Sequence, residues 1–236
     1  MSNVFSNTDW PQRFSGRVRV LPLPHTVLFP HITVALHLFE PPARSLLQES
    51  LADDRLIALV NAPLTPSGRQ EEAGGLASVA CVGKIASYAE VDPGRFNVLL
   101  YGLKRVRLIT PHRNDQGYWT ADVQLLEDRY SAEGEASRSA LHRRLQELFE
   151  LYAPAGFLDQ EMFQQFGWED ACLGTLTDII AYTLDIPLAI KQQLLAECDV
   201  DVRGRIVLRC LQQACERRSA GDRSAIPGFP SPFSDN

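Results

Sequence analysis

The chain has 236 residues, of which 45% are hydrophobic and 22% charged, a composition typical of a globular protein that buries its own core without disulfides or metals. With 29 acidic and 23 basic residues its net charge is -6, which excludes the broad positive field expected of a nucleic-acid-binding protein. Its five cysteines form no Cys-x-x-Cys pair and no uncharged apolar run approaches the roughly 18 residues of a membrane span, so we expect reduced thiols, no membrane contact and a cytoplasmic protein.

The first half of the chain shows the two-residue period of β-strands. Residues 32–38 alternate in apolar character, the pattern of a half-buried strand, and residues 117–125 do the same. The run 56–60 is apolar throughout, which predicts a fully buried strand. Two β-rich runs between 82 and 108 flank an Asp-Pro-Gly turn at 92–94, so we expect a β-hairpin there.

One helix is expected inside this β region. The prolines at 41 and 42 suit a first helical turn, whose amides lack partners in any case, and apolar side chains then recur on one helical face at Ala43, Leu46, Leu47 and Leu51. Residues 63–75 are rich in Pro, Gly and polar side chains, which predicts an exposed loop.

Beyond the β region the apolar period changes from two to 3.6. The stripes predict four or five helices with short connections, a compact bundle, with Asp170 as one N-cap. The apolar positions are Leu141, Leu145, Leu148, Phe149 and Tyr152; Met162, Phe163 and Phe166; Leu173, Leu176, Ile180 and Leu184; Leu194 and Leu195 after Pro187; and Val202, Ile206, Cys210 and Ala214. The expected domains are a flexible N-terminus at 1–16, a β-rich domain at 17–127, a linker at 128–137, a helical bundle at 138–218 and a flexible tail at 219–236.

Six short motifs then follow one another in a recognisable order. They are Leu21-Pro22-Leu23, Phe29-Pro30, Val82-Gly83-Lys84-Ile85, Gly102 followed by Arg105, Thr120-Ala121-Asp122-Val123, and Lys191-Gln192-Gln193-Leu194-Leu195. Over residues 17–214 the chain resembles the N-terminal substrate-recognition domain of Lon proteases. The resemblance implies an α+β fold, a PUA-like β pseudobarrel with one inserted helix followed by an α-helical bundle.

The motifs of the other Lon modules are missing from these 236 residues. No Gly-x-x-x-x-Gly-Lys-[Ser/Thr] phosphate-binding motif occurs, since Gly83-Lys84 is followed by Ile85, and no Ser-Lys protease motif is found. The resemblance therefore implies a free-standing, non-enzymatic recognition domain without cofactor or metal, related to protein quality control and proteolysis. Its expected partners are unfolded or exposed polypeptide segments, and a protease or another folded protein is a further candidate.

A polypeptide-binding surface is expected around the Phe29-Pro30 motif and Phe39, flanked by Glu40 and Arg44. Exposed apolar side chains there would gain free energy when a partner covers them. A packed bend is the alternative for Phe29-Pro30, and the seam between the β part and the helices is a second expected location. The candidate binding residues are Phe29, Pro30, His31, Phe39, Glu40 and Arg44.

Three further motif residues are expected to be structural. Gly83 lies in a strand pattern, and Gly102 should sit in a turn that has no room for a side chain. The Arg105 guanidinium can fork onto a buried carboxylate such as Glu40, locking the sheet to the helix, or it can grip a ligand carboxylate.

Three other functions remain open at this point. His25, His31 and His37 recur every six residues, a spacing that aligns three metal ligands of a hydrolase on one face of an unbroken strand, although Pro30 interrupts that strand. The Pro-aromatic tail at 226–233 could dock a specific folded partner, which would make the chain an adapter. A PUA-like face could bind RNA or a small ligand, which the acidic balance opposes for RNA.

Overall fold

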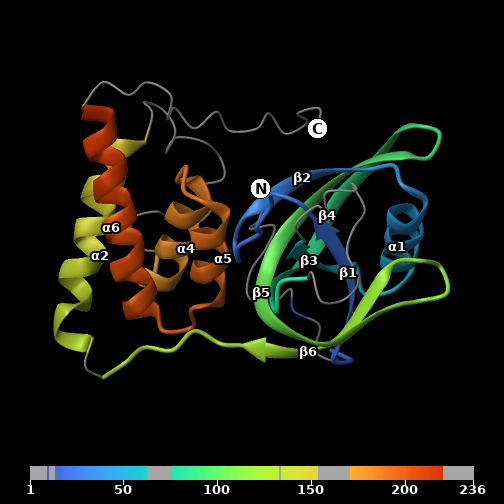
Figure 1. Cartoon of the computed structure of the whole chain (residues 1–236), viewed down its shortest axis with the longest axis horizontal. Coiled ribbons are helices and arrows are strands. Elements are labelled where there is room, and N and C mark those ends of the chain that lie inside the picture. Colours follow the sequence, from blue (N-terminus) through green and yellow to red (C-terminus); the bar gives the residue numbers. More distant parts are fainter. Residues whose placement is uncertain (1–9, 11–13, 63–75, 133, 154–170, 220–236) are drawn as a thin grey trace, which may run out of the picture. The chain divides into compact units, whose positions relative to one another are not determined.

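The computed structural model describes residues 10, 14–62, 76–132, 134–153 and 171–219, which divide into two compact units (Figure 1). One unit ends at Leu126 and holds the six described strands and helix α1. The other begins at Glu127 and holds helices α2, α4, α5 and α6. The chain is therefore an α+β protein, as expected. The predicted loop at 63–75, the helix beginning at Met162 and the tail after Ser219 lie outside the described residues.

The strands and the helix expected from the sequence are present in the β unit. Apolar alternation is matched by burial: β2 alternates half-buried and buried residues, and β3 is buried at its first five positions. The predicted hairpin joins β4 to β5, and Gly94 supplies the positive φ of its turn, at 77°. The elements are β1 (Arg17–Leu23), β2 (Thr33–Leu38), α1 (Pro41–Ala52), β3 (Leu56–Asn61), β4 (Val79–Asp92), β5 (Arg95–Arg113) and β6 (Trp119–Leu126).

Five of the strands close into a ring. β1 pairs with β3, β3 with β4, β4 with β5, β5 with β6, and β6 returns to β1. The β1–β3 pairing is parallel, which the sequence pattern did not reveal, and all the others are antiparallel. β2 stays outside the ring and pairs with β5 alone among the described strands. The result is a small barrel with one additional strand.

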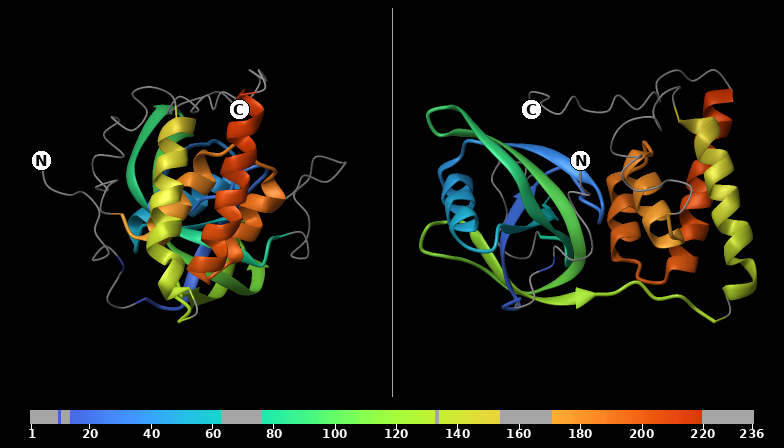
Figure 2. Two further views of the ribbon diagram at one scale, coloured as in Figure 1. Left: turned by 90° about the vertical axis from the view of Figure 1, so that its left-hand side faces the viewer. Right: turned by 180° about the vertical axis from the view of Figure 1, so that it is seen from behind.

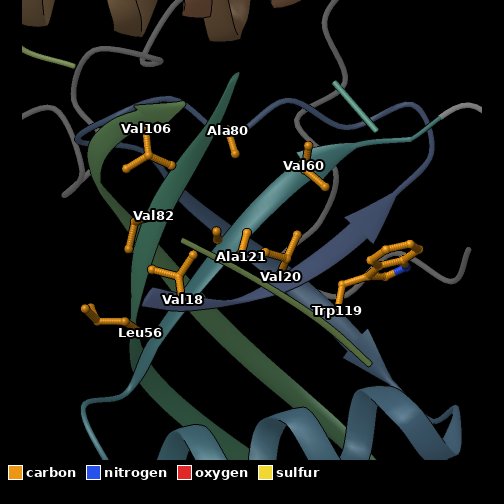
Figure 3. Packing of buried hydrophobic residues seen from close by; sticks show 10 residues of the cluster. Val18, Val20, Leu56, Val60, Ala80, Val82, Val106, Trp119 and Ala121 are labelled. Carbon is orange, nitrogen blue, oxygen red and sulfur yellow. The ribbon is translucent and has the colours of Figure 1, made fainter. Parts of the chain in front are cut away.

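The interior of the barrel is filled by alternate side chains of these strands. They are mostly Val and Ala, with Trp119 at one end (Figure 3). Small β-branched and Ala side chains suit the narrow interior of a five-membered ring. The cluster comprises Val18, Val20, Leu56, Ala58, Val60, Ala80, Val82, Val106, Trp119 and Ala121.

Helix α1 lies at one end of the barrel, between the β4–β5 and β5–β6 hairpins (Figure 2, right). It buries Leu46 and Leu47 completely. Two carboxylates follow the C-terminus of α1 and form ion pairs with Arg19 of β1, Asp53 at 2.7 Å and Asp54 at 3.1 Å. These contacts fix the helix against the barrel and so determine where its N-terminus, which follows β2, is placed.

The second unit consists of helices that pack on one another. α2 contacts α4 and α6, and α4 also contacts α5 and α6. The helix predicted after Pro187 is confirmed, but the N-cap of α4 is Cys172, whereas the expected cap Asp170 lies outside the described residues. The helices are α2 (Glu135–Tyr152), α4 (Leu173–Thr183), α5 (Leu188–Ala196) and α6 (Val200–Ser219).

The buried face of α6 differs from the predicted one. Of the four expected positions only Ala214 is buried, and Val202, Ile206 and Cys210 are half-exposed. The buried face instead contains two charged residues, Asp201 and Arg203, which an apolar period cannot reveal. The observed buried residues are Val200, Asp201, Arg203, Gly204, Val207, Leu211 and Ala214.

The segment after Leu126, where we expected a linker at 128–137, contacts the helical unit through side-chain and backbone interactions. Asp128 accepts two hydrogen bonds from the buried Arg203 guanidinium, at 3.0 and 2.6 Å. Arg129 forms a parallel β-bridge with Asp199, and α2 begins at Glu135, three residues before the expected start. Charge-assisted hydrogen bonds therefore fasten this segment to the helical unit, although its composition is polar.

Candidate functional site

The long strands β4 and β5 extend past the barrel. Residues 79–84 of β4 belong to the ring, whereas residues 85–90 pair only with β5 among the described strands. Residues 96–101 of β5 pair with this part of β4 on one side and with β2 on the other. We call these three segments, 33–38, 96–101 and 85–90, the three-stranded extension.

Two glycines mark the junction between the barrel and the extension. Gly83 and Gly102 are register partners, beside a shift in the β4–β5 ladder. Gly102 lies inside β5 and not in the turn that we expected, and a Cβ there would lie 2.1 Å from the Phe29 carbonyl oxygen. The backbone around residue 29 therefore approaches β5 more closely than a side chain at position 102 would permit. The backbone amide of His31 donates a hydrogen bond to the Gly102 carbonyl at 2.8 Å.

The six candidate binding residues do not form one surface. Phe29, Pro30 and His31 precede β2, and Phe39, Glu40 and Arg44 follow it, so the two groups are separated by a six-residue strand of roughly 20 Å. Phe29 has no exposed surface and Pro30 is buried. The packed bend is therefore the observed arrangement, and the first group cannot offer an apolar floor to a partner.

The second group lies at the exposed end of the extension. Phe39 directly follows β2 and is 56% exposed, and Val91, beside the hairpin turn, is 53% exposed. Leu38 and Glu90 both pair with Phe96, from opposite sides of β5. Phe39 and Val91 are the next residues after this pair, so they lie at the same end of the sheet. Two large apolar side chains are thus exposed at one end of the sheet.

One face of the extension lies opposite the buried side chains. Its two central rows of residues, paired across the three strands, contain no Asp, Glu, Lys or Arg. Val34, Leu36 and Leu38 are buried, so strand alternation places the intervening residues of β2 on the opposite face. All of the residues in those rows are half-buried or exposed. One row is Ala35, Leu99 and Ser87, and the other is His37, Asn97 and Ala89.

Charged side chains flank this end unevenly. The Glu40 carboxylate is exposed, and it makes no hydrogen bond or ion pair in the part of the chain that the structure describes. Arg44 of α1 lies against the hairpin turn, where a Cβ at Gly94 would meet its guanidinium, while Glu90 accepts the Gly94 amide at 2.9 Å. The exposed charged residues at this end thus include Glu40, together with Asp92 and Arg95 at the hairpin turn.

Arg105 lies far from Glu40, which was our example of a carboxylate with which it could pair. It is 4% exposed and is the register partner of Cys81 in β4 and Leu126 in β6. Glu40 lies two residues after Leu38, the register partner of Phe96. Along β5, Phe96 is nine positions from Arg105, a distance of roughly 30 Å. Arg105 therefore belongs to the barrel and not to the end where α1 begins.

The histidine hypothesis finds no support in the described residues. His25 and His31 have positive φ values of 58° and 67°, so the backbone turns at both positions and only His37 lies in a strand. Across the described ranges, no three His, Cys, Asp or Glu side chains are grouped so that they could hold a metal ion.

None of the described helices has the length and apolar character needed to span a membrane.

The helical unit contains one chemically distinct thiol. Burial raises the pKa of Cys172, but hydrogen bonds with Thr175 and Tyr130 outweigh burial and leave that pKa below its usual value. The same surroundings raise the pKa of Tyr130 to about 12, mainly through burial. The sequence signal for this site was a Cys-x-x-Thr spacing before an apolar helical stripe, and from it we expected only a reduced thiol.

Comparison with known proteins relates the chain to Lon proteases. It is 29% identical over 206 residues to Lon protease 1 of Bdellovibrio bacteriovorus, covering 86% of this chain and 25% of that protein. It is 30% identical over 188 residues to Lon protease of Xanthomonas oryzae, covering 78% of this chain and 21% of that protein. The chain thus spans about a quarter of the length of the curated relatives it matches.

Two solved structures share the fold. One is the N-terminal domain of Lon protease from the Mycobacterium avium complex, with a TM-score of 0.62 at 19% identity, covering 83% of this chain and 98% of that one. The other is a Lon N-terminal domain protein from Xanthomonas campestris, with a TM-score of 0.56 at 19% identity, covering 82% and 97%. The family defined by the substrate-binding domain of ATP-dependent protease La (LON) matches residues 17–213, and the chain belongs to that family.

Proposed function

We propose that this chain recognises exposed apolar segments of other polypeptides through the uncharged face and the apolar end of the three-stranded extension, and that it does so without catalysis of its own. The observation that carries the proposal is the pair of exposed side chains Phe39 and Val91 beside two rows without charged residues, in a chain of the substrate-binding family. Large apolar side chains exposed together are typical of interaction sites.

The proposal extends to the setting of this surface. The closed ring of strand pairings supports a PUA-like pseudobarrel, and the mutual contacts of α2, α4 and α6 support a helical bundle. The chain would act in the cytoplasm, beside the machinery that degrades its clients. The match to the substrate-binding part of the relatives, and not to their remaining three quarters, supports a recognition role.

The expected affinity is modest. Covering apolar surface yields about 25 cal/mol per Å², but ordering a flexible client segment cancels much of that gain. We therefore expect dissociation constants in the micromolar range, suited to a module that samples many clients and releases them.

Titration with an unfolded polypeptide tests this proposal. Fluorescently labelled β-casein should bind the purified chain, and Phe39→Ser should weaken binding about tenfold because it removes the most exposed apolar side chain of the surface. Leu151→Ser is the matched control, since Leu151 is 78% exposed but lies on α2 in the other unit. No binding by the wild-type chain, or equal loss in both variants, would contradict the proposal.

A further inference from the structure

Strand β2 has one edge that pairs with β5 and another that pairs with no described strand. In an antiparallel ladder, pairs that exchange hydrogen bonds alternate with pairs that do not. The Gly102 amide donates to the Ile32 carbonyl at 2.8 Å, just before the register begins at Thr33 and Tyr101. The even-numbered residues of β2 therefore bond to β5, and the backbone N–H and C=O groups of Thr33 and Ala35 point to the other edge.

The two outer edges of the extension differ in how they resist pairing with another chain. Proteins protect exposed edges with bulges, charges or proline. The β4 edge has register shifts at Ile85/Ser87 and Glu90/Asp92 and carries the carboxylates of Glu90 and Asp92. β2 is regular over all six residues and contains no charged residue and no proline. Only the β4 edge is protected.

The end of β2 shows what kind of chain would fit this edge. A strand added there would continue directly onto the exposed ring of Phe39, so the apolar contact and the main-chain contact would be continuous. The next residue, Glu40, presents a carboxylate without a partner in the described part of the chain. An uncharged segment with a basic residue at this end satisfies both features.

We propose that the client segment binds by strand addition: an extended, uncharged stretch of polypeptide pairs with the free edge of β2, and a Lys or Arg beside it pairs with Glu40. The main-chain bonds to Thr33 and Ala35 would give affinity that does not depend on client sequence, while Phe39 and Glu40 would give preference. This inference rests on the proposed function, since it names the mode by which the same surface holds its clients.

N-methylated peptides test the pairing without altering the protein. The probe is a soluble peptide of alternating valine and threonine that ends in two lysines, prepared unmodified, methylated on odd-numbered amides, and methylated on even-numbered amides. A strand that pairs along one edge uses every second amide. One methylated peptide should therefore lose at least about tenfold in affinity while the other keeps it. Equal affinity of the two would overturn strand addition.

A variant of Ala35 provides a second measurement. Ala35→Pro removes the N–H that faces the edge without a described partner strand and leaves the β2–β5 ladder intact. Casein binding should fall about tenfold in this variant and persist in Leu151→Ser, which lies outside the surface, with both variants folded by circular dichroism. Binding of casein that is sensitive to Phe39→Ser but not to Ala35→Pro would overturn strand addition and retain the proposed function.

The remaining outcomes are also decisive. If the wild-type chain binds neither casein nor the peptide, both proposals fail. If sedimentation shows a dimer that Ala35→Pro converts to a monomer, the edge belongs to a second copy of this chain and not to a client.

A peptide with glutamates in place of its terminal lysines tests the role of Glu40. It should bind about fivefold less well than the lysine peptide, and the difference should shrink at high salt. Equal binding of the two peptides would remove Glu40 from the site.

Discussion

Gly83 and Gly102 are register partners across β4 and β5, at the point where the barrel gives way to the three-stranded extension. A Cβ on Gly83 would lie 2.7 Å from Leu100 Cγ, and one on Gly102 would lie 2.1 Å from the Phe29 carbonyl oxygen. Gly102 thus lacks a side chain where the segment before β2 approaches, and Gly83 lacks one where β5 itself approaches, at Leu100 and the Tyr101 carbonyl. The close approach at Gly102 helps to place the start of the strand that carries the candidate edge.

Gly102→Ala should therefore destabilise the β unit by about 3 kcal/mol, because the added methyl group meets backbone and not a movable side chain. Urea unfolding followed by tryptophan fluorescence, to which the buried Trp119 contributes, measures the change. Gly204→Ala is the control, since its Cβ would meet side-chain atoms and not backbone, Leu141 Cδ2 at 3.0 Å and Thr177 Cγ2 at 3.6 Å, and alanine favours the helix. Equal stability of the wild type and Gly102→Ala would mean that the Phe29 backbone can withdraw freely.

The buried guanidinium of Arg203 should be the main polar determinant of stability in the helical unit. It has no exposed surface and bonds to Asp128, to Thr177 Oγ1 at 3.0 Å and to the Glu197 carbonyl at 2.8 Å. Arg203→Met removes the guanidinium that lies 3.5 Å from the buried Asp178 carboxylate and bonds to the half-buried Asp128, so we expect a loss of about 3–5 kcal/mol. The exposed Arg205→Met on the same helix should change stability by less than about 0.5 kcal/mol. Urea titrations monitored by circular dichroism compare them.

Acid should unfold the helical unit partly through Asp201. Hydrogen bonds from Arg138 hold the pKa of Asp201 below its ordinary value, and the carboxylate is 1% exposed. A carboxylate with a depressed pKa in the folded state stabilises that state above its unfolded pKa, near 4, and loses this contribution as the pH falls through the lower folded pKa.

Asp201→Asn should therefore be less stable than the wild type at pH 7, and the difference should shrink below roughly pH 4. Thermal unfolding from pH 7 to pH 3 measures this difference. Asp122→Asn is the control, because Asp122 pairs with Arg17 on the exposed side of the barrel. A wild-type advantage that does not change with pH would show that the carboxylate charge is not what stabilises the unit.

Cys172 should be alkylated at lower pH than Cys210 and Cys215. Its pKa is lowered by hydrogen bonds that outweigh burial, whereas burial raises the pKa of Cys210 and of Cys215. Mass spectrometry after brief iodoacetamide treatment across a pH series gives the half-point for each cysteine. Thr175→Val should move the Cys172 half-point upward and leave that of Cys215 unchanged, and an unchanged Cys172 half-point would contradict this origin of the shift.

The local elements of this protein follow from its sequence because each depends on neighbours along the chain. The hairpin at 92–94 needs only a proline and a glycine in order, and α1 needs two prolines before an apolar helical stripe. The family resemblance also comes from short motifs in order. These features, and the α+β class, were therefore predicted correctly from residues alone.

The candidate surface could be predicted only in part. Phe39, Glu40 and Arg44 lie together as expected because they are adjacent in the chain, at the junction of β2 and α1. Phe29 and Pro30 were assigned to the same surface, but tertiary packing buries them against β5. Val91 was missed because its exposure beside Phe39 depends on the registers of three strands, which hydrophobic alternation does not specify.

Most strands and helices, the hairpin turn and the family resemblance follow from the sequence, because they depend on a spacing of a few residues; strand β1 was not predicted individually. The contact of Gly102 with a backbone carbonyl, the burial of Arg203 on Asp128 and the edge of β2 that pairs with no described strand are known only from the three-dimensional structure. Each of these is a contact between residues tens of positions apart, and its free energy depends on burial and geometry that no local period encodes.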